Sequence, residues 1–271
     1  MPSRNAKLVS APVSQGDVVL EIEGAVATVT IERPSKINAI RLPTWQALSM
    51  LVGAADRNPA VGVIVVRGAG GHFSAGNDIA VLSTFPGRLA DAQAFGAAWA
   101  EAIETIEDAS KPVIMAIEGV CYGSALAMSL GGDIRVASSN AVFSIPVAKL
   151  GALYLRSDLQ RLVATIGMGQ SKKLLYTSDS FGAEEALGIG LVDEVFPEES
   201  FAAELQRLIA NMLERSPFTL RRSKQLLRGC VPAGNCRETR ESLAAFAEAT
   251  QSTDFTEGIS AFLERRKAVF R

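Results

Sequence analysis

The stretch "KPVIMAIEGVCYGSALAMSLGGDIRVAS" (residues 111–138) contains the pattern that decides the fold. Its first part is a continuous apolar run ending at Gly119, which is typical of a parallel strand buried on both faces. The turn "YGS" then leads directly into a helical stretch, and residues 134–146 predict two short strands. Between Tyr122 and Asp133 there is no His, Glu, Lys or Cys. This turn therefore offers backbone N–H groups rather than titratable side chains.

The same order of elements occurs upstream. "VVLEIEG" and "AVATVTIE" (18–32) predict a hairpin, and the apolar spacing in 43–56 predicts an amphipathic helix. "VGVIVVRG" (61–68) is another buried strand, followed by a glycine-rich loop (68–78) and an Ala-rich helix over 89–107. The strand, loop and helix recur about every 50 residues, which predicts an α/β fold of repeated ββα units in a superhelical stack. Ligands are then expected at the carboxyl ends of the strands.

The chain divides into three parts. Residues 1–16 resemble a loose, flexible tail, and 17–199 form the ββα core. Residues 200–271 lack strand patterns and form a helical region with apolar stripes. One stripe begins at Phe201, and another includes Phe255, Ile259, Phe262 and Leu263. A region this apolar is expected to pack on the core or on another subunit.

Composition excludes several classes of protein. The chain has 271 residues, 48% of them hydrophobic, which suits one globular unit. Its net charge of −2 gives no electrostatic attraction to nucleic acid or to an anionic membrane. No run approaches the roughly 18 apolar residues that span a bilayer. One histidine and three cysteines without a CxxC pair argue against a metal site and favour a reducing cytoplasm.

Two turns are candidates for a shared site. "FSAGND" (73–78) and "YGSALA" (122–127) each follow a buried strand and each precede helical sequence. Because strand ends of a parallel sheet lie side by side, the turns are expected to converge and to aim two backbone N–H groups at one point, as in an oxyanion hole. Tight turns that only pack strand on helix remain the alternative. The loop after Gly68 lacks the third glycine of a dinucleotide fingerprint, so NAD binding is not expected.

Six ordered motifs, covering about residues 18–270, resemble the crotonase, or enoyl-CoA hydratase/isomerase, family. They are the 111–138 stretch, "ERPSKINAI" (32–40), "HFSAGNDI" (72–79), "AVFSIPVAKLG" (141–151), "EALGIGLVDEVFP" (185–197) and "EGISAFLERRKAVF" (257–270). The resemblance implies an enzyme that stabilises the enolate of an acyl-CoA thioester with the backbone N–H groups of Asn77 and Ser124. The family commonly has glycine at the second place, so the Ser124 hydroxyl is a departure. It also implies a homotrimer, or a dimer of trimers, assembled through the C-terminal helices.

The resemblance fails at two positions. In hydratases of the family two glutamates handle a water and its proton, and the matching residues here are Ala127 and Val147. Hydrocarbon side chains cannot transfer protons, and a general base or acid is worth roughly 10²–10⁴ in rate. Ordinary hydratase or isomerase activity is therefore disfavoured unless replacement groups enter the site.

Tyr154 is the candidate replacement. Its position matches a tyrosine in the methylmalonyl-CoA decarboxylase branch of the family, although the histidine of that branch is Asn77 here. Decarboxylation needs no base, because loss of CO₂ itself leaves an enolate. A decarboxylase-like carbon–carbon lyase is the first choice, with Tyr154 or an amide orienting the carboxylate. Arg156 and Asp158 are expected either to contact that carboxylate or a water, or to lie on the surface.

Other functions stay open. Replacement groups would permit hydration or isomerisation, and Ser124 with His72 suggests an acyl-CoA thioesterase, although no GxSxG elbow is present. A CoA-thioester binder without turnover is a further alternative.

The resemblance also implies contacts to CoA. They would come from Lys36, Ile37 and the Ala75 backbone, and from Phe262 and Lys267 on a neighbouring subunit. No metal or redox cofactor is expected beyond the CoA moiety of the substrate.

Overall fold

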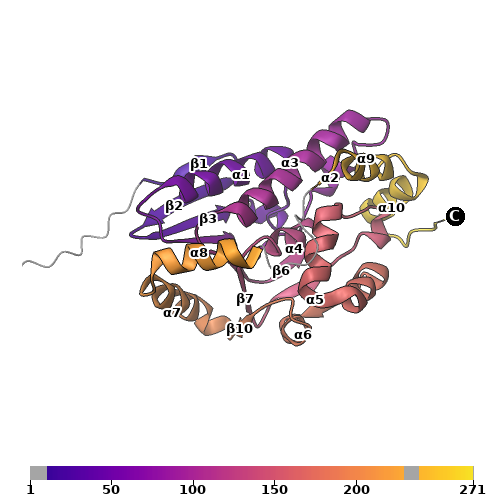
Figure 1. Cartoon of the computed structure of the whole chain (residues 1–271). Helices are drawn as coiled ribbons and strands as arrows, with labels where there is room; N and C mark the ends of the chain where they lie inside the picture. Colours follow the sequence, from indigo (N-terminus) through magenta and orange to yellow (C-terminus); the bar gives the residue numbers. More distant parts are fainter. Residues whose placement is uncertain (1–10, 229–237, 271) are drawn as a thin grey trace, which may run out of the picture.

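A seven-stranded sheet forms the centre of the computed structural model, which describes residues 11–228 and 238–270 (Figure 1). Its strand order is β1-β2-β3-β4-β5-β7-β10. The first three strands pair antiparallel, and the pairs from β3 onward are parallel. The strands are β1 (Val13–Gln15), β2 (Val18–Glu23), β3 (Val26–Ile31), β4 (Val63–Gly68), β5 (Val113–Ile117), β7 (Ile134–Ser138) and β10 (Glu194–Phe196).

The strand patterns behave as their sequences predict. The β2–β3 hairpin turns at Gly24, whose φ of +60° favours glycine. β3 alternates between buried and half-buried residues, whereas β5 is buried throughout. A strand buried on both faces needs cover on each side.

One face of the sheet is covered by two long helices, α1 (Leu42–Arg57) and α3 (Leu89–Asp108), which pack against each other. The indole rings of Trp45 and Trp99 stack between them with centroids 6.0 Å apart. The other face packs on α7 (Phe201–Leu213) through a second apolar cluster that includes Phe201, Leu205 and Ile209. The core therefore has two layers, one on each side of the sheet.

A second, three-stranded sheet lies beside the first. It contains β6 (Val120–Tyr122), β8 (Val142–Ser144) and β9 (Ser180–Gly182) in the order β6-β8-β9. The short elements of the described chain are η1 (Pro34–Lys36), α2 (Ile79–Leu82), α4 (Ser124–Ser129), η2 (Ala148–Leu150), α6 (Ala183–Gly188) and η3 (Glu198–Ser200). The longer α5 (Arg156–Thr177) is interrupted at Gly167, where φ is +73°.

The C-terminal helices separate into two pairs. α7 and α8 (Pro217–Arg228) lie at one end of the molecule, and α9 (Arg240–Ala249) and α10 (Thr253–Leu263) lie at the other (Figure 1). The Ser216 hydroxyl accepts from the Thr219 amide at 3.3 Å, at the start of α8. α9 packs on α3, and α10 packs on η2.

The α/β fold with its ββα units is confirmed, but two details differ from the expectations. Residues 13–15, which were assigned to the loose tail, form the edge strand β1. In the C-terminal stripe, Phe255 and Ile259 are buried, whereas Phe262 and Leu263 are exposed. The rest of the tail, residues 1–10, and residues 229–237 with Cys230 and Cys236 lie outside the described part. Within that part, no helix combines the length and apolarity needed to cross a membrane.

Candidate active site

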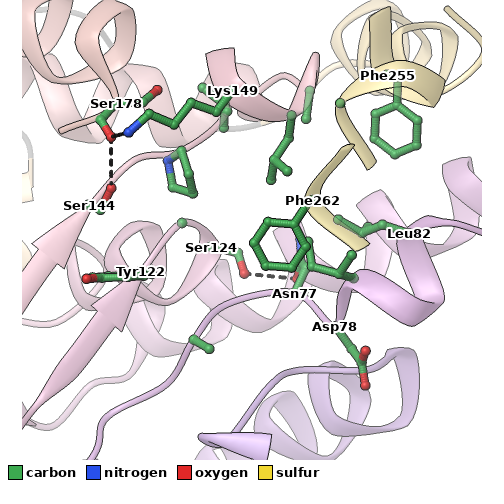
Figure 2. A pocket seen from close by; sticks show the side chains of 18 of the residues that line it. Asn77, Asp78, Leu82, Tyr122, Ser124, Ser144, Lys149, Ser178, Phe255 and Phe262 are labelled. Atoms are coloured by element: carbon green, nitrogen blue, oxygen red, sulfur yellow. Dashed lines mark hydrogen bonds between the residues drawn. The ribbon is translucent and has the colours of Figure 1, made fainter. Parts of the chain in front are cut away.

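A cavity of about 1020 Å³ lies where the segments after β4 and β5 meet η2 and the C-terminal helices (Figure 2). It brings together residues that are far apart in the sequence. All eight predicted site residues line it: Lys36, Ile37, Ala75, Asn77, Ser124, Tyr154, Phe262 and Lys267. The two turns singled out in the sequence therefore face one space.

The two turns are joined by their backbones. The Ser74 amide donates to the Val120 carbonyl at 2.9 Å, and the Tyr122 amide donates to the Ser74 carbonyl at 3.0 Å. Gly76 adopts φ +83°, and a Cβ there would lie 2.6 Å from the Tyr122 carbonyl oxygen and 3.2 Å from the Ser124 nitrogen. Only glycine permits this approach, which brings residue 77 next to residue 124.

The backbone N–H groups of Asn77 and Ser124 differ from those of their neighbours. Gly76 donates to the Ser74 hydroxyl, Asp78 to the Ile40 carbonyl, and Gly123 to the Ser144 carbonyl. Within residues 11–228 and 238–270, no hydrogen bond from the Asn77 or Ser124 amide is found. An unpaired amide inside a protein costs free energy. Two such N–H groups at one cavity are therefore typical of a site that binds an acceptor oxygen of a ligand.

The Asn77 side chain is fixed by two donors. Trp45 Nε1 donates to its Oδ1 at 3.1 Å. The Ser124 hydroxyl donates to the same oxygen at 2.9 Å (Figure 2). The Asn77 carboxamide therefore keeps its NH₂ group as the donor for other partners. The single hydroxyl hydrogen of Ser124 is used in this contact.

Tyr154 contacts the backbone of the second turn. The residue is 5% exposed, and its hydroxyl donates to the Gly123 carbonyl at 2.6 Å. Its ring meets Trp99 edge to face with centroids 6.3 Å apart. Burial, together with the charge of Asp158, raises the pKa of Tyr154 well above its usual value. The phenol is thus a neutral donor whose hydrogen is directed at the turn.

Ala127 and Val147, the residues at the two glutamate positions, have different environments. Ala127 is fully buried in α4 and does not line the cavity, whereas Val147 does. Asp78 is the one carboxylate among the described lining residues. It pairs with Arg33 at 2.6 Å and caps α2 through the Ala80 amide. Burial alone would raise the pKa of Asp78, but these hydrogen bonds and nearby positive charge lower it.

The other charged candidates lie elsewhere or have partners. Arg156 is exposed and Asp158 is buried beside Arg161, and neither lines the cavity. Arg156 therefore agrees with the alternative of a surface position, whereas the buried Asp158 agrees with neither alternative. Lys149 lines the cavity, but its Nζ donates to the Ser178 carbonyl at 2.6 Å (Figure 2).

A Ser–His pair is absent from the described residues. His72 Nδ1 accepts from the Val120 amide at 3.2 Å, and His72 does not line the cavity. Because the Ser124 hydroxyl donates to Asn77 instead, nothing in this geometry activates it as a nucleophile.

Three exposed basic residues line the cavity, namely Lys36, Arg266 and Lys267. Phe262 and Lys267 line the cavity of their own chain. Arg266 was missed as a site residue, although the basic run "ERRK" (264–267) signals it. The apolar wall from Trp99, Phe246 and Phe255 was also missed. Among the described residues, no group of His, Cys, Asp or Glu is arranged to hold a metal ion.

The fold and the site are those of an α/β protein with a large cavity, at which two backbone amides without a described partner lie close together. Residues 21–271 match the model of the enoyl-CoA hydratase/isomerase family. Crotonyl-CoA hydratase of Syntrophomonas wolfei is 33% identical over 94% of this chain and 97% of its own. The peroxisomal Delta(3,5)-Delta(2,4)-dienoyl-CoA isomerase of Arabidopsis thaliana is 30% identical over 92% of this chain and 93% of its own.

Solved structures agree with this result. An enoyl-CoA hydratase/carnithine racemase from Magnetospirillum magneticum superimposes with a TM-score of 0.78 at 27% identity, over 95% of this chain and 96% of that one. A methylmalonyl-CoA decarboxylase in complex with 2-nitronate-propionyl-CoA gives a TM-score of 0.81 at 24% identity, over 95% and 99%, and so shares the fold. The chain belongs to the enoyl-CoA hydratase/isomerase family and is an enzyme of that family.

Proposed function

We propose that this protein binds an acyl-CoA thioester and stabilises its enolate with the backbone amides of Asn77 and Ser124. The proposed reaction is decarboxylase-like carbon–carbon cleavage. Support comes from the two amides without a described partner at one cavity, because preorganised donors act most strongly where negative charge develops.

A single observation favours decarboxylation over the other reactions of the family. Asp78, the one carboxylate among the described lining residues, has its oxygens on Arg33 and on the Ala80 amide. Hydration and isomerisation need a group that removes a proton, whereas decarboxylation does not. In the proposed step the bond between Cα and the carboxylate breaks, its electron pair enters the enolate, and CO₂ leaves. A proton from water then adds to Cα.

The Asn77 carboxamide is the proposed contact for the substrate carboxylate. Its oxygen accepts from Trp45 and Ser124, so its NH₂ group is left to donate. Tyr154 is a weaker candidate for this contact, since its hydroxyl hydrogen is directed at Gly123.

Hydration is the second candidate, because crotonyl-CoA hydratase is among the similar proteins. It requires a replacement for the glutamates at the Ala127 and Val147 positions. A thioesterase lacks a described base near Ser124, and a binder without turnover is the outcome if no reaction occurs.

A substrate panel tests the proposal. Release of CO₂ from malonyl-CoA and methylmalonyl-CoA is measured beside hydration of crotonyl-CoA, with the same enzyme preparation. We expect decarboxylation to exceed hydration by at least roughly 10², the lower end of what one proton-transfer group contributes. Brisk hydration with little CO₂ release would reject the decarboxylase proposal.

Several further expectations remain predictions. Lys36, Ile37 and the Ala75 backbone are proposed to contact CoA, and Phe262 and Lys267 are proposed to reach its nucleotide, on a neighbouring subunit. No metal or redox cofactor is proposed. A trimer or dimer of trimers is supported by the exposed apolar side chains of α8, such as Phe218 and Leu227. A cytoplasmic location also stays a prediction.

A further inference from the structure

We propose that Tyr154 is a positioning residue that acts on the substrate through the peptide group between Gly123 and Ser124. This inference rests on the proposed oxyanion role of the Ser124 amide. It gives Tyr154 a different role from a direct contact with the substrate carboxylate.

One peptide group connects Tyr154 to the site. The carbonyl that accepts from the Tyr154 hydroxyl and the N–H of Ser124 belong to the same planar amide. No cis peptide bond occurs in the described residues, so this carbonyl and this N–H point in opposite directions. A donor on the carbonyl side therefore fixes the direction of the N–H on the other side.

This peptide group and the one before it are held by hydrogen bonds. The Gly123 carbonyl accepts from the Ala127 amide at 3.1 Å as well as from Tyr154 at 2.6 Å. The Gly123 amide donates to the Ser144 carbonyl at 2.9 Å. Gly123 itself adopts φ +53°, a conformation that favours glycine. The orientation of the Ser124 N–H is thus set before a ligand arrives.

The hydrogen bond from Tyr154 also changes the electronics of the amide. A donor at the carbonyl oxygen draws electron density from nitrogen and makes the N–H a stronger donor, by roughly 10–30% per bond in a hydrogen-bonded chain. Burial keeps the pKa of the phenol high, so the donor persists through the neutral pH range. The edge contact with Trp99 holds the ring in place.

Infrared spectroscopy of a bound thioester tests this role. Butyryl-CoA with a ¹³C-labelled carbonyl has no carboxylate, so it reports on the oxyanion donors alone. We expect the carbonyl stretch to move to lower frequency on binding to the unchanged protein, and to move less on binding to Tyr154→Phe. Tyr122→Phe is the matched control: Tyr122 also lines the cavity, but its hydroxyl lies 3.3 Å from Ser180 Oγ. The carbonyl stretch of butyryl-CoA bound to Tyr122→Phe should equal that of butyryl-CoA bound to the unchanged protein.

Kinetics separate the positioning role from a direct contact. Removing one oxyanion donor costs roughly 10²–10³ in kcat, so weakening one is expected to cost less, about 5- to 30-fold, with KM nearly unchanged. A rise in KM for malonyl-CoA with the butyryl-CoA stretch unaltered would show a direct contact and overturn the proposal. An unaltered stretch with unaltered kinetics would show a simple wall residue and would also overturn it.

A second variant keeps the test decisive if Tyr154→Phe folds poorly. Replacing Tyr154 with 3-fluorotyrosine makes the phenol a stronger donor, so the stretch should move further to lower frequency. No shift in either direction would reject the role of Tyr154. The two proposals fail in different ways, because absence of any shift in the unchanged protein would contradict the oxyanion site itself.

Discussion

At the scale of single residues, the site depends on backbone groups whose side chains have other tasks. Ser124 illustrates this division: its amide faces the proposed oxyanion, while its hydroxyl donates to Asn77 at 2.9 Å. The Asn77 carboxamide is in turn fixed by Trp45. These side chains position each other, and the proposed chemistry belongs to the main chain.

Substitutions at Ser124 separate the amide from the hydroxyl. Ser124→Ala keeps the N–H, so we expect a loss of less than about 10-fold in kcat, compared with roughly 10²–10³ for a removed oxyanion donor. Ser124→Pro removes the N–H at the first residue of α4, a position where proline fits a helix. In this variant kcat is expected to fall by the full factor of roughly 10²–10³. Steady-state kinetics with circular dichroism as a folding control measure both effects.

A nucleophilic serine would make the two variants equally inactive, because both remove the hydroxyl. If Ser124→Ala abolished activity as completely as Ser124→Pro, the hydroxyl would take part in the reaction, and the backbone assignment would be wrong.

At the scale of elements, the sequence predicts those parts whose patterns are local. The apolar runs of β4 and β5 and the periodicity of α1 depend on neighbouring residues, and these elements are found where they were expected. The convergence of the two turns follows from parallel strand order. The contact from Trp45 to Asn77 and that from Tyr154 to Gly123 join residues 32 and 31 positions apart, so no local pattern indicates them.

The docking of α10 on η2 is another contact that local patterns do not indicate. Gly258 of α10 approaches Leu150 so closely that an added Cβ would lie 2.4 Å from the Leu150 carbonyl carbon. Both residues line the cavity. This contact therefore connects helix packing to the shape of the site.

Replacing Gly258 with alanine tests the close packing. Alanine normally favours a helix by roughly 0.5–1 kcal/mol. Here the overlap with the backbone is expected to outweigh that gain and to cost about 1–3 kcal/mol of unfolding free energy. Gly169→Ala is the control, because nothing lies within 4 Å of its added Cβ. Thermal unfolding of both variants, with binding of butyryl-CoA, measures the difference, and equal melting temperatures would contradict the packing argument.

At the scale of the whole molecule, a buried charged cluster joins three distant segments. Arg161 of α5 pairs with Glu107 of α3 at 2.7 Å and with Asp158 at 3.3 Å. The Ser157 amide donates to Glu238, just before α9, at 2.5 Å. The cluster therefore connects α3, α5 and the segment that leads into the C-terminal helices. Its protonation state is expected to affect the stability of the assembled fold rather than that of one element.

Asp158 makes this dependence measurable. Its side chain is fully buried, and burial, aided by the charge of Glu238 and opposed by Arg161, raises its pKa to about 7. In the unfolded chain the pKa returns to about 3.9. Between these values the folded state holds more protons than the unfolded state, so the contribution of Asp158 to stability is complete below the lower pKa and is lost as pH rises toward 7.

The variant Asp158→Asn removes the titration and keeps an oxygen that accepts from Arg161. Asparagine stays neutral at all these pH values. The melting temperature of the variant minus that of the unchanged protein should therefore increase as pH rises from 5 to 8. Differential scanning calorimetry at intervals of pH measures this difference, and subtracting the two proteins cancels the titration of shared groups. A difference that stays constant over this interval would mean that Asp158 is ionised throughout, and that Arg161 compensates its charge more fully than burial opposes it.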